Sequence, residues 1–110
     1  MVRFDKAHAS ESGDYYQVLF ERGGERDQYL LIQRQFEFRD GGLCYIETHD
    51  MSRSGHFRIV RAKLSPQCLV LACDNGPEVE AMFNASEEEY LEVRRILQIM
   101  LPHLEVAVAC

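Results

Sequence analysis

The sequence contains no long apolar run. A helix that crosses a bilayer needs about 20 consecutive apolar residues, and no segment of this chain comes near that length. The N-terminal residues, MVRFDKAHASESGDYY, also lack the apolar stretch of a secretory signal peptide. We therefore expect a cytoplasmic protein that does not bind a membrane.

The cysteines lack a recognisable spacing. No pair has the C-x-x-C pattern of a zinc knuckle or a redox site. Two of them flank the apolar run LVLA, where a thiol usually acts as a small hydrophobic side chain. For an intracellular chain we expect free structural thiols rather than a disulfide. The cysteines concerned are Cys44, Cys68, Cys73 and Cys110.

A basic surplus is also missing. Twelve Lys and Arg residues stand against 18 Asp and Glu residues, which gives a net charge of -6. A general nucleic-acid binder would carry a positive surplus, so we expect no direct nucleic-acid partner. The charges are segregated: residues 64–93 contain seven acids and no Lys or Arg, whereas residues 51–63 contain four basic residues and no acid. Such segregation is either surface decoration or suits an electrostatically steered partner.

Catalytic motifs are absent from the sequence. The histidines lie beside no nucleophile motif, and the glycine pairs at 23–24 and 41–42 precede no predicted helix and lack the lysine of a P-loop. Carboxylates for acid–base chemistry are present at Glu78, Glu80 and the predicted helix start, but nothing places them in a cleft. We predict that the protein is not an enzyme and uses no cofactor.

One group of residues has the composition of a metal site. His49, Asp50 and His56 flank the turn MSRSG, and a hairpin would bring them close together. Two imidazoles and a carboxylate could bind zinc. A polar turn often collects such residues by chance, so we favour the interpretation without a metal.

The pattern predicts an α+β fold in a single domain, residues 1–110, with a six- to seven-stranded antiparallel meander sheet and one C-terminal amphipathic helix packed on it. Runs rich in Tyr, Val, Ile and Phe alternate with turn residues, as in antiparallel strands. The expected strands cover residues 15–21, 29–38, 43–49, 56–64, 68–74 and 78–85. Residues 1–13 show no sustained period and are expected to form a loose arm or a first edge.

The fourth strand does not alternate simply. Phe57 and Ile59 share one parity, whereas Val60, Ala62 and Leu64 share the other. A β-bulge near Ile59 and Val60 would turn all five apolar side chains inward. The same bulge would leave the basic side chains outward, namely Arg58, Arg61 and Lys63.

The last element changes period. Ser86 followed by Glu89 forms a capping box, and the acidic first turn suits the helix dipole. Apolar residues then recur at helical spacing until Pro102 ends the helix. Residues 102–110 form a tail or a short extra strand.

Arg34 interrupts the apolar face of the predicted second strand, YLLIQRQFEF. A buried guanidinium needs a carboxylate or several carbonyls around it. Glu47, on the next predicted strand, is the nearest candidate carboxylate. Alternatively, Arg34 lies near the rim of the sheet, its stem covering the core while its head reaches water.

Three segments together resemble the Immunity protein 10 family of bacterial polymorphic toxin systems. These are QYLLIQRQFEF, SGHFRIVRAKLSP and FNASEEEYLEVRRILQIM, and the resemblance runs over residues 29–100. It consists of an apolar strand ending in Gln-Arg, a middle strand with SGHFRIV and a SEEEY helix entry. It brings no catalytic motif with it.

The resemblance implies an immunity protein that binds a cognate toxin and occludes its active surface without chemistry of its own. If the toxin is a nuclease, its substrate groove should be basic, and the acidic segment would fill that groove as a phosphate mimic. A homodimer is also left open. The candidate partner-binding residues are Asp74, Glu78, Glu80, Glu87, Glu88 and Glu92.

A second interpretation rests on architecture alone. A meander closed by a C-terminal helix is also the arrangement of pleckstrin-homology-like domains, which bind anionic headgroups or peptides. In that case the outward basic row of Arg58, Arg61 and Lys63 would bind the anion.

Overall fold

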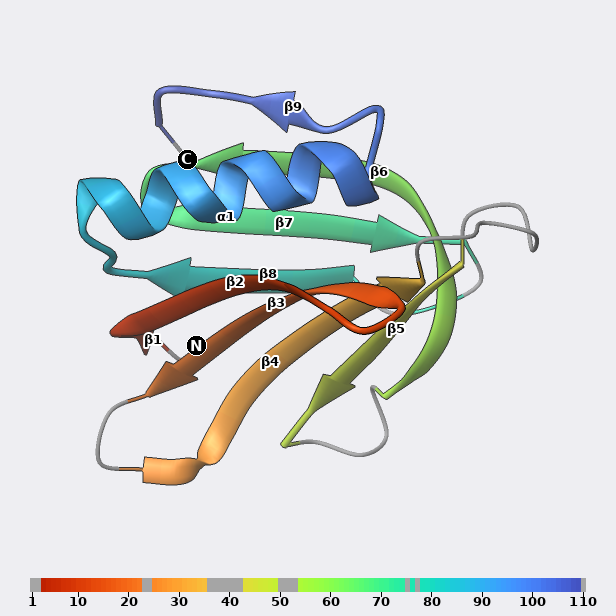
Figure 1. Ribbon diagram of the computed structural model, residues 1–110, viewed down its shortest axis with the longest axis horizontal. Coiled ribbons are helices and arrows are strands. Elements are labelled where there is room, and N and C mark those ends of the chain that lie inside the picture. The colour runs from red at the N-terminus through yellow and green to blue at the C-terminus, as the bar shows by residue number, and fades with distance from the viewer. Residues whose placement is uncertain are drawn as a thin grey trace.

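A curved, mostly antiparallel sheet with one C-terminal helix forms the protein (Figure 1). The computed structural model describes residues 3–22, 25–35, 43–49, 54–74, 76 and 78–109. The strands are β1 Arg3–Phe4, β2 Lys6–Ser12, β3 Tyr15–Arg22, β4 Glu25–Gln35, β5 Leu43–Thr48, β6 Gly55–Ser65, β7 Cys68–Cys73, β8 Glu78–Phe83 and β9 Glu105–Val106, and the helix is α1 Glu87–Met100. The α+β class is confirmed, although the described residues form nine strands rather than six or seven. No helix in the described part of the chain is long and apolar enough to cross a membrane.

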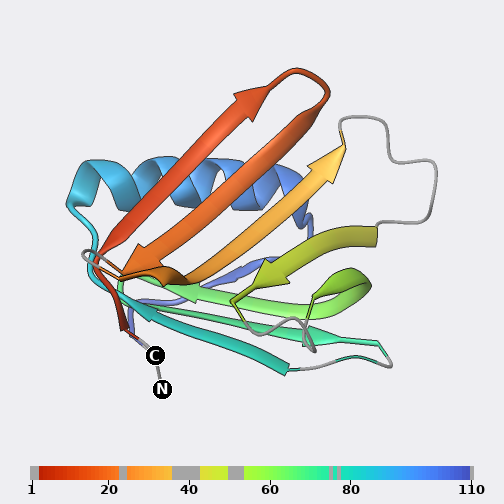
Figure 2. The same ribbon diagram turned by 90° about the horizontal axis from the view of Figure 1, so that it is seen from below.

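Strands β2 to β8 follow one another as a meander in which every neighbouring pair is antiparallel. Of the loose arm and the first edge expected for residues 1–13, the edge is found: the segment forms β1 and β2, separated only by Asp5. Strand β2 pairs with β3 at one end of the meander, and β1 pairs in parallel with β8 at the other. The N-terminal segment therefore joins both ends of the sheet, which curls around a common interior (Figure 2).

Strand β6 serves both halves of the curled sheet. Its first half pairs with β5 and its second half with β7, and the register shifts between Ile59 and Arg61. The predicted bulge is confirmed, but Val60 does not turn inward: it is 60% exposed. The reason is that the extra residue of a bulge shifts the alternation by one position, so Val60 and Arg61 both lie outward while Ile59 and Ala62 lie inward. Arg58 and Arg61 are exposed and Lys63 is half-buried, as an outward basic row requires.

The helix begins as the sequence predicts. The hydroxyl of Ser86 accepts a hydrogen bond from the Glu89 amide at 3.1 Å, and the Glu89 carboxylate accepts one from the Ser86 amide at 2.8 Å. This capping box satisfies two backbone donors that the first turn would otherwise leave without partners. The helix packs beside β2 and β3, where an ion pair joins Arg95 to Glu11 at 2.8 Å.

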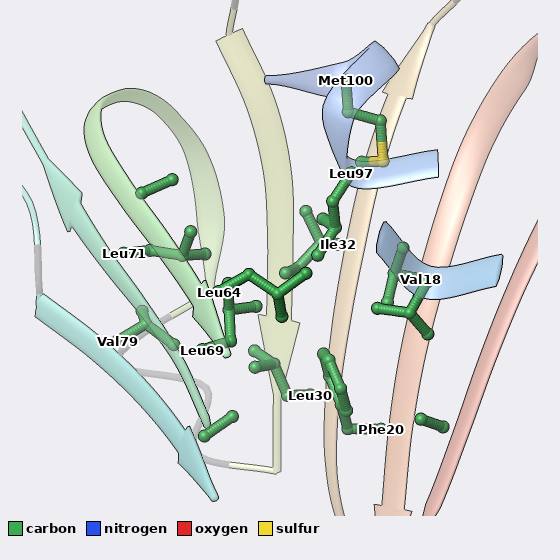
Figure 3. Packing of buried hydrophobic residues seen from close by; sticks show 14 of the residues in the cluster. Val18, Phe20, Leu30, Ile32, Leu64, Leu69, Leu71, Val79, Leu97 and Met100 are labelled. Carbon is green, nitrogen blue, oxygen red and sulfur yellow. The ribbon is translucent and has the colours of Figure 1, made fainter. Parts of the chain in front are cut away.

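The core lies between the two halves of the sheet and the helix. Buried side chains from β3, β4, β6, β7 and β8 line this interior together with Leu97 and Met100 of α1 (Figure 3). Phe20 is fully buried, with its ring 4.9 Å from that of Phe83 and 6.1 Å from that of Phe4. Because Phe4 belongs to β1 and Phe83 to β8, this aromatic contact holds the N-terminal segment against the far end of the meander.

Arg34 lies on the inner parity of β4, with Leu30 and Ile32, and is half-buried. Its Nη1 atom donates a hydrogen bond to the backbone carbonyl of Met100, the last residue of α1. The last turn of the helix has no basic residue of its own, so Arg34 supplies the positive charge that the C-terminal end of a helix favours. The arginine within the apolar row is therefore a tie between the sheet and the helix.

The C-terminal segment adds a short strand. β9 pairs in parallel with β6, with Glu105 opposite Lys63 and Val106 opposite Leu64. Of the two alternatives expected for residues 102–110, a tail or a short extra strand, the structure shows the strand.

The cysteines behave differently from one another. Cys68 is disulfide-bonded, so the expectation of a free thiol is wrong there. That expectation assumed a cytoplasmic chain whose cysteines serve only as small apolar side chains. Cys44 and Cys73 are free, and burial raises the pKa of the Cys44 thiol to about 11.

Candidate functional site

The predicted acidic residues occupy two places. Glu78 and Glu80 point outward from β8, since Val79 and Ala81, which alternate with them, are buried. Asp74, just after β7, is exposed as well. The three carboxylates line one end of the curled sheet on its outer side.

The other acids belong to α1. Glu87 and Glu88 are exposed in its first turn, next to the end of β8. At about 3.4 Å per residue, Glu78 lies roughly 17 Å along β8 from Phe83. Glu92 binds Arg95 within the helix at 2.5 Å. We call these six acids the acidic band; they lie in two groups, one at β7 and β8 and one on α1, and the charge of Glu92 is already paired.

The predicted basic row is bordered by acids. Across the outer face, Lys63 of β6 lies opposite Val70 of β7, which lies opposite Glu80 of β8. Two strand spacings amount to about 10 Å, and Glu105 lies beside Lys63 on the other side. An anion bound by this row would therefore lie close to two carboxylates.

Sequence reasoning missed a cluster on the outer face of β4 and β5. The hydroxyl of Tyr29 donates to one oxygen of Glu47 at 2.8 Å, and the hydroxyl of Tyr45 donates to the other at 2.6 Å. We call these three residues the tyrosine–glutamate clamp. All three are half-buried. Leu31 lies directly opposite Glu47 on the neighbouring strand.

Glu47, the nearest candidate carboxylate in the sequence, does not pair with Arg34. Leu30 and Ile32 point inward from β4, as Arg34 does, whereas Glu47 shares the outward parity of Tyr45. The two side chains therefore lie on opposite faces of the sheet. On the inner face, Arg34 donates to the carbonyl of Met100.

The hydrogen bonds of the clamp shift the protonation of all its members. Bonding from Tyr45 and then Tyr29 lowers the pKa of the Glu47 carboxyl below its usual value. The same bonds to Glu47 raise the pKa of both phenols. A carboxylate that accepts hydrogen bonds is stabilised in its charged form. Glu47 is therefore an anion held in one orientation.

The surroundings of the clamp are polar and aromatic. The ring of Tyr45 lies 5.1 Å from that of His56 on β6, tilted by 50°. On the other side, the amide of Gln33 donates to that of Gln17 at 2.7 Å. Gln33 lies opposite Tyr45, so both contacts involve residues next to Tyr45.

The structure describes two of the three candidate metal ligands, His49 and His56. His49 lies near the backbone of Tyr29, with its Nδ1 atom 3.4 Å from the Tyr29 amide, and His56 packs on Tyr45. Asp50 lies outside the described residues. Within the described ranges, no three His, Cys, Asp or Glu side chains gather as metal ligands.

Comparisons with known proteins give no match: no protein-family model, no curated protein and no solved structure matches this chain.

One signal in the sequence could have indicated the clamp. Tyr45 and Glu47 are two residues apart on one strand, which puts them on the same face. The alternation was ambiguous, because Leu43 and Tyr45 are apolar on one parity and Cys44 and Ile46 on the other. Tyr29 joins them only through the register of β4 with β5, which no local pattern reveals.

Proposed function

We propose that this protein is an immunity protein that binds a cognate bacterial toxin and occludes its active surface. Two independent considerations support the proposal. One is the resemblance of three segments between residues 29 and 100 to the Immunity protein 10 family, which no family-model match accompanies, and the other is the exposed acids that the surface offers to a partner. Binding alone would provide the protection, without chemistry by this chain.

The observation that carries the proposal is the state of the acidic band. Asp74, Glu78, Glu80, Glu87 and Glu88 are exposed, and within the described part of the chain none of them makes an ion pair. Exposed, unneutralised charge of one sign accelerates association with an oppositely charged partner. A toxin with a basic substrate groove, such as a nuclease, is the partner that this band suits best.

The test uses the C-terminal toxin module of an adjacent gene, where such a gene is found. Its affinity for the wild-type chain is measured by calorimetry, and protection is measured by co-expression at a low level. We expect the Glu87→Lys/Glu88→Lys and Glu78→Lys/Glu80→Lys variants to weaken binding at least tenfold.

Asp14→Lys, in the β2–β3 turn, changes charge at an exposed position away from the band and serves as the control. We expect it to bind as the wild type does. If no adjacent toxin module binds the wild-type chain, the proposed function is wrong. If both double variants protect fully, the band is not the interface.

The pleckstrin-homology-like alternative is favoured by one observation, the shared outward orientation of the basic residues on β6. Its binding residues would be Arg58, Arg61 and Lys63. Glu80 and Glu105 beside Lys63 oppose it, because a like charge near the site repels an anionic headgroup. Sedimentation with vesicles rich in phosphatidylserine at low salt tests it, and absence of co-sedimentation would eliminate it.

A further inference from the structure

We propose that the tyrosine–glutamate clamp is a docking site for an arginine side chain presented by a protein partner. The clamp lies on the outer face of β4 and β5, apart from the acidic band on β8 and α1. It therefore constitutes a second interaction surface, and it does not depend on the identity of the toxin.

The charge of Glu47 is not neutralised within the described part of the protein. Glu47 makes no ion pair with any Arg, Lys or His among the residues that the structure describes. Its two hydrogen bonds come from neutral phenols, which orient the carboxylate without neutralising it. A cation from outside the molecule would therefore find a full negative charge on a half-buried, aromatic surface.

The Glu47 carboxylate has acceptor positions that the two tyrosines leave free. A carboxylate offers about four acceptor positions, two on each oxygen. The phenols of Tyr29 and Tyr45 bind different oxygens and so use one position on each. One position remains on each oxygen, which is the arrangement that the two parallel N–H groups of a guanidinium require. The ammonium of lysine cannot make this paired contact.

The side chains around Glu47 are aromatic. Two tyrosines flank the carboxylate, and their ring faces attract a cation. Tyrosine also supplies contact area at low cost in conformational entropy, which explains its enrichment at protein interfaces. Tyr45 is further fixed by the His56 ring. The site is therefore ordered before the arginine arrives, which favours affinity.

The experiment titrates a defined peptide, acetyl-Gly-Arg-Gly-Arg-Gly-amide, into the isotopically labelled full chain and follows backbone amide shifts by NMR at low salt. We expect saturable shifts centred on Leu31, Tyr45 and Glu47. A peptide with citrulline in place of arginine keeps the shape and loses the charge. We expect it to bind at least tenfold more weakly.

Two variants complete the test. Glu47→Gln keeps hydrogen-bonding capacity toward the tyrosines but removes the charge, so it should weaken binding of the arginine peptide at least tenfold while the unfolding midpoint changes little. Glu78→Gln/Glu80→Gln removes two charges elsewhere on the surface and should leave the shifts at the clamp unchanged.

Three outcomes would overturn the proposal. One is an absence of saturable shifts at the clamp. Another is equal binding by the Glu47→Gln variant. The third is a loss of binding in the Glu78→Gln/Glu80→Gln variant, which would mean that the peptide follows the net charge of the protein and not the clamp.

Discussion

At the scale of single residues, the two most informative side chains are charged groups that make hydrogen bonds to neutral ones. Arg34 binds the carbonyl at the end of α1, and Glu47 binds two phenols. The first holds two elements of the fold together from inside. The second keeps its charge on the outside, where a partner can reach it.

We expect Arg34→Met to destabilise the protein. The substitution keeps much of the apolar stem but removes the hydrogen bond to Met100 and the charge at the helix end. Hydrogen bonds made by charged groups contribute about 1.5–3 kcal/mol, so the free energy of unfolding should fall by about that amount. Urea unfolding measures it. Arg61→Met, at an exposed position on β6, is the control and should change stability by less than about 0.5 kcal/mol. An unchanged urea midpoint for Arg34→Met would contradict the structural role.

We expect Glu47→Gln to change the titration of two tyrosines. The hydrogen bonds to the Glu47 carboxylate raise the pKa of the Tyr29 and Tyr45 phenols, because they stabilise the protonated phenol and place a negative charge beside it. Without that charge, both phenols should ionise at lower pH. Alkaline titration of tyrosinate absorbance measures the change. A titration curve identical to that of the wild type would show that the clamp does not form in solution.

At the scale of elements, the start of α1 is the best-defined feature. Ser86 and Glu89 bind each other's backbone, and burial of one helical face does the rest. Local chemistry of this kind is readable in the sequence, and the capping box and the proline after the helix were both predicted. The middle strands were predicted for the same reason, since their apolar periods are strong.

We expect the capping box to weaken in acid. The hydrogen bond from the Ser86 amide lowers the pKa of the Glu89 carboxyl below its unfolded value of 4.5. The carboxylate therefore stabilises the folded state above that pH, and the contribution is lost as the pH falls through the folded-state pKa. The stability difference between wild type and Glu89→Gln should shrink on acidification. Urea unfolding at several pH values measures it, and Glu88→Gln, in the same turn, leaves the box intact. A difference independent of pH would contradict the assignment.

Strands β1 and β2 show where local patterns fail. Among the side chains of these strands whose burial the structure describes, Phe4 and Ala7 are buried and Ala9 is half-buried, and polar residues separate them. Alanine carries little hydrophobic signal, but it allows α1 to pack closely beside β2. Small residues separated by polar ones predicted a loose arm or a first edge. The same pattern is what an edge strand covered by a helix requires.

At the scale of the whole molecule, closure of the sheet depends on long-range pairing. β1 meets β8 although nearly the whole meander lies between them in the sequence. The Met100 carbonyl reaches Arg34 from a separation of 66 residues. Such contacts follow from the twist of the sheet and the path of the chain, which single-strand periodicity does not contain. The partner of Arg34 and the composition of the clamp could not be predicted for this reason.

We expect Phe4→Ala to destabilise the entire molecule. Phe4 is 4% exposed and contacts Phe20 in the core, so its truncation should cost about 3–5 kcal/mol. Denaturant unfolding measures the loss, and amide hydrogen exchange should accelerate throughout β3 and β8. Arg3→Ala, on the same strand but exposed, is the control. Faster exchange confined to β1 would mean that the N-terminal strand is peripheral.

The position of α1 after the sheet in the chain has a consequence for biosynthesis. All strands from β1 to β8 leave the ribosome before the helix that covers their interior. At about 5–20 residues per second, the helix follows with a delay on the order of a second. During that delay the nascent sheet presents its apolar side to the cell. Rare codons within α1 would lengthen this interval, and chaperones that bind exposed apolar surface would find their substrate then.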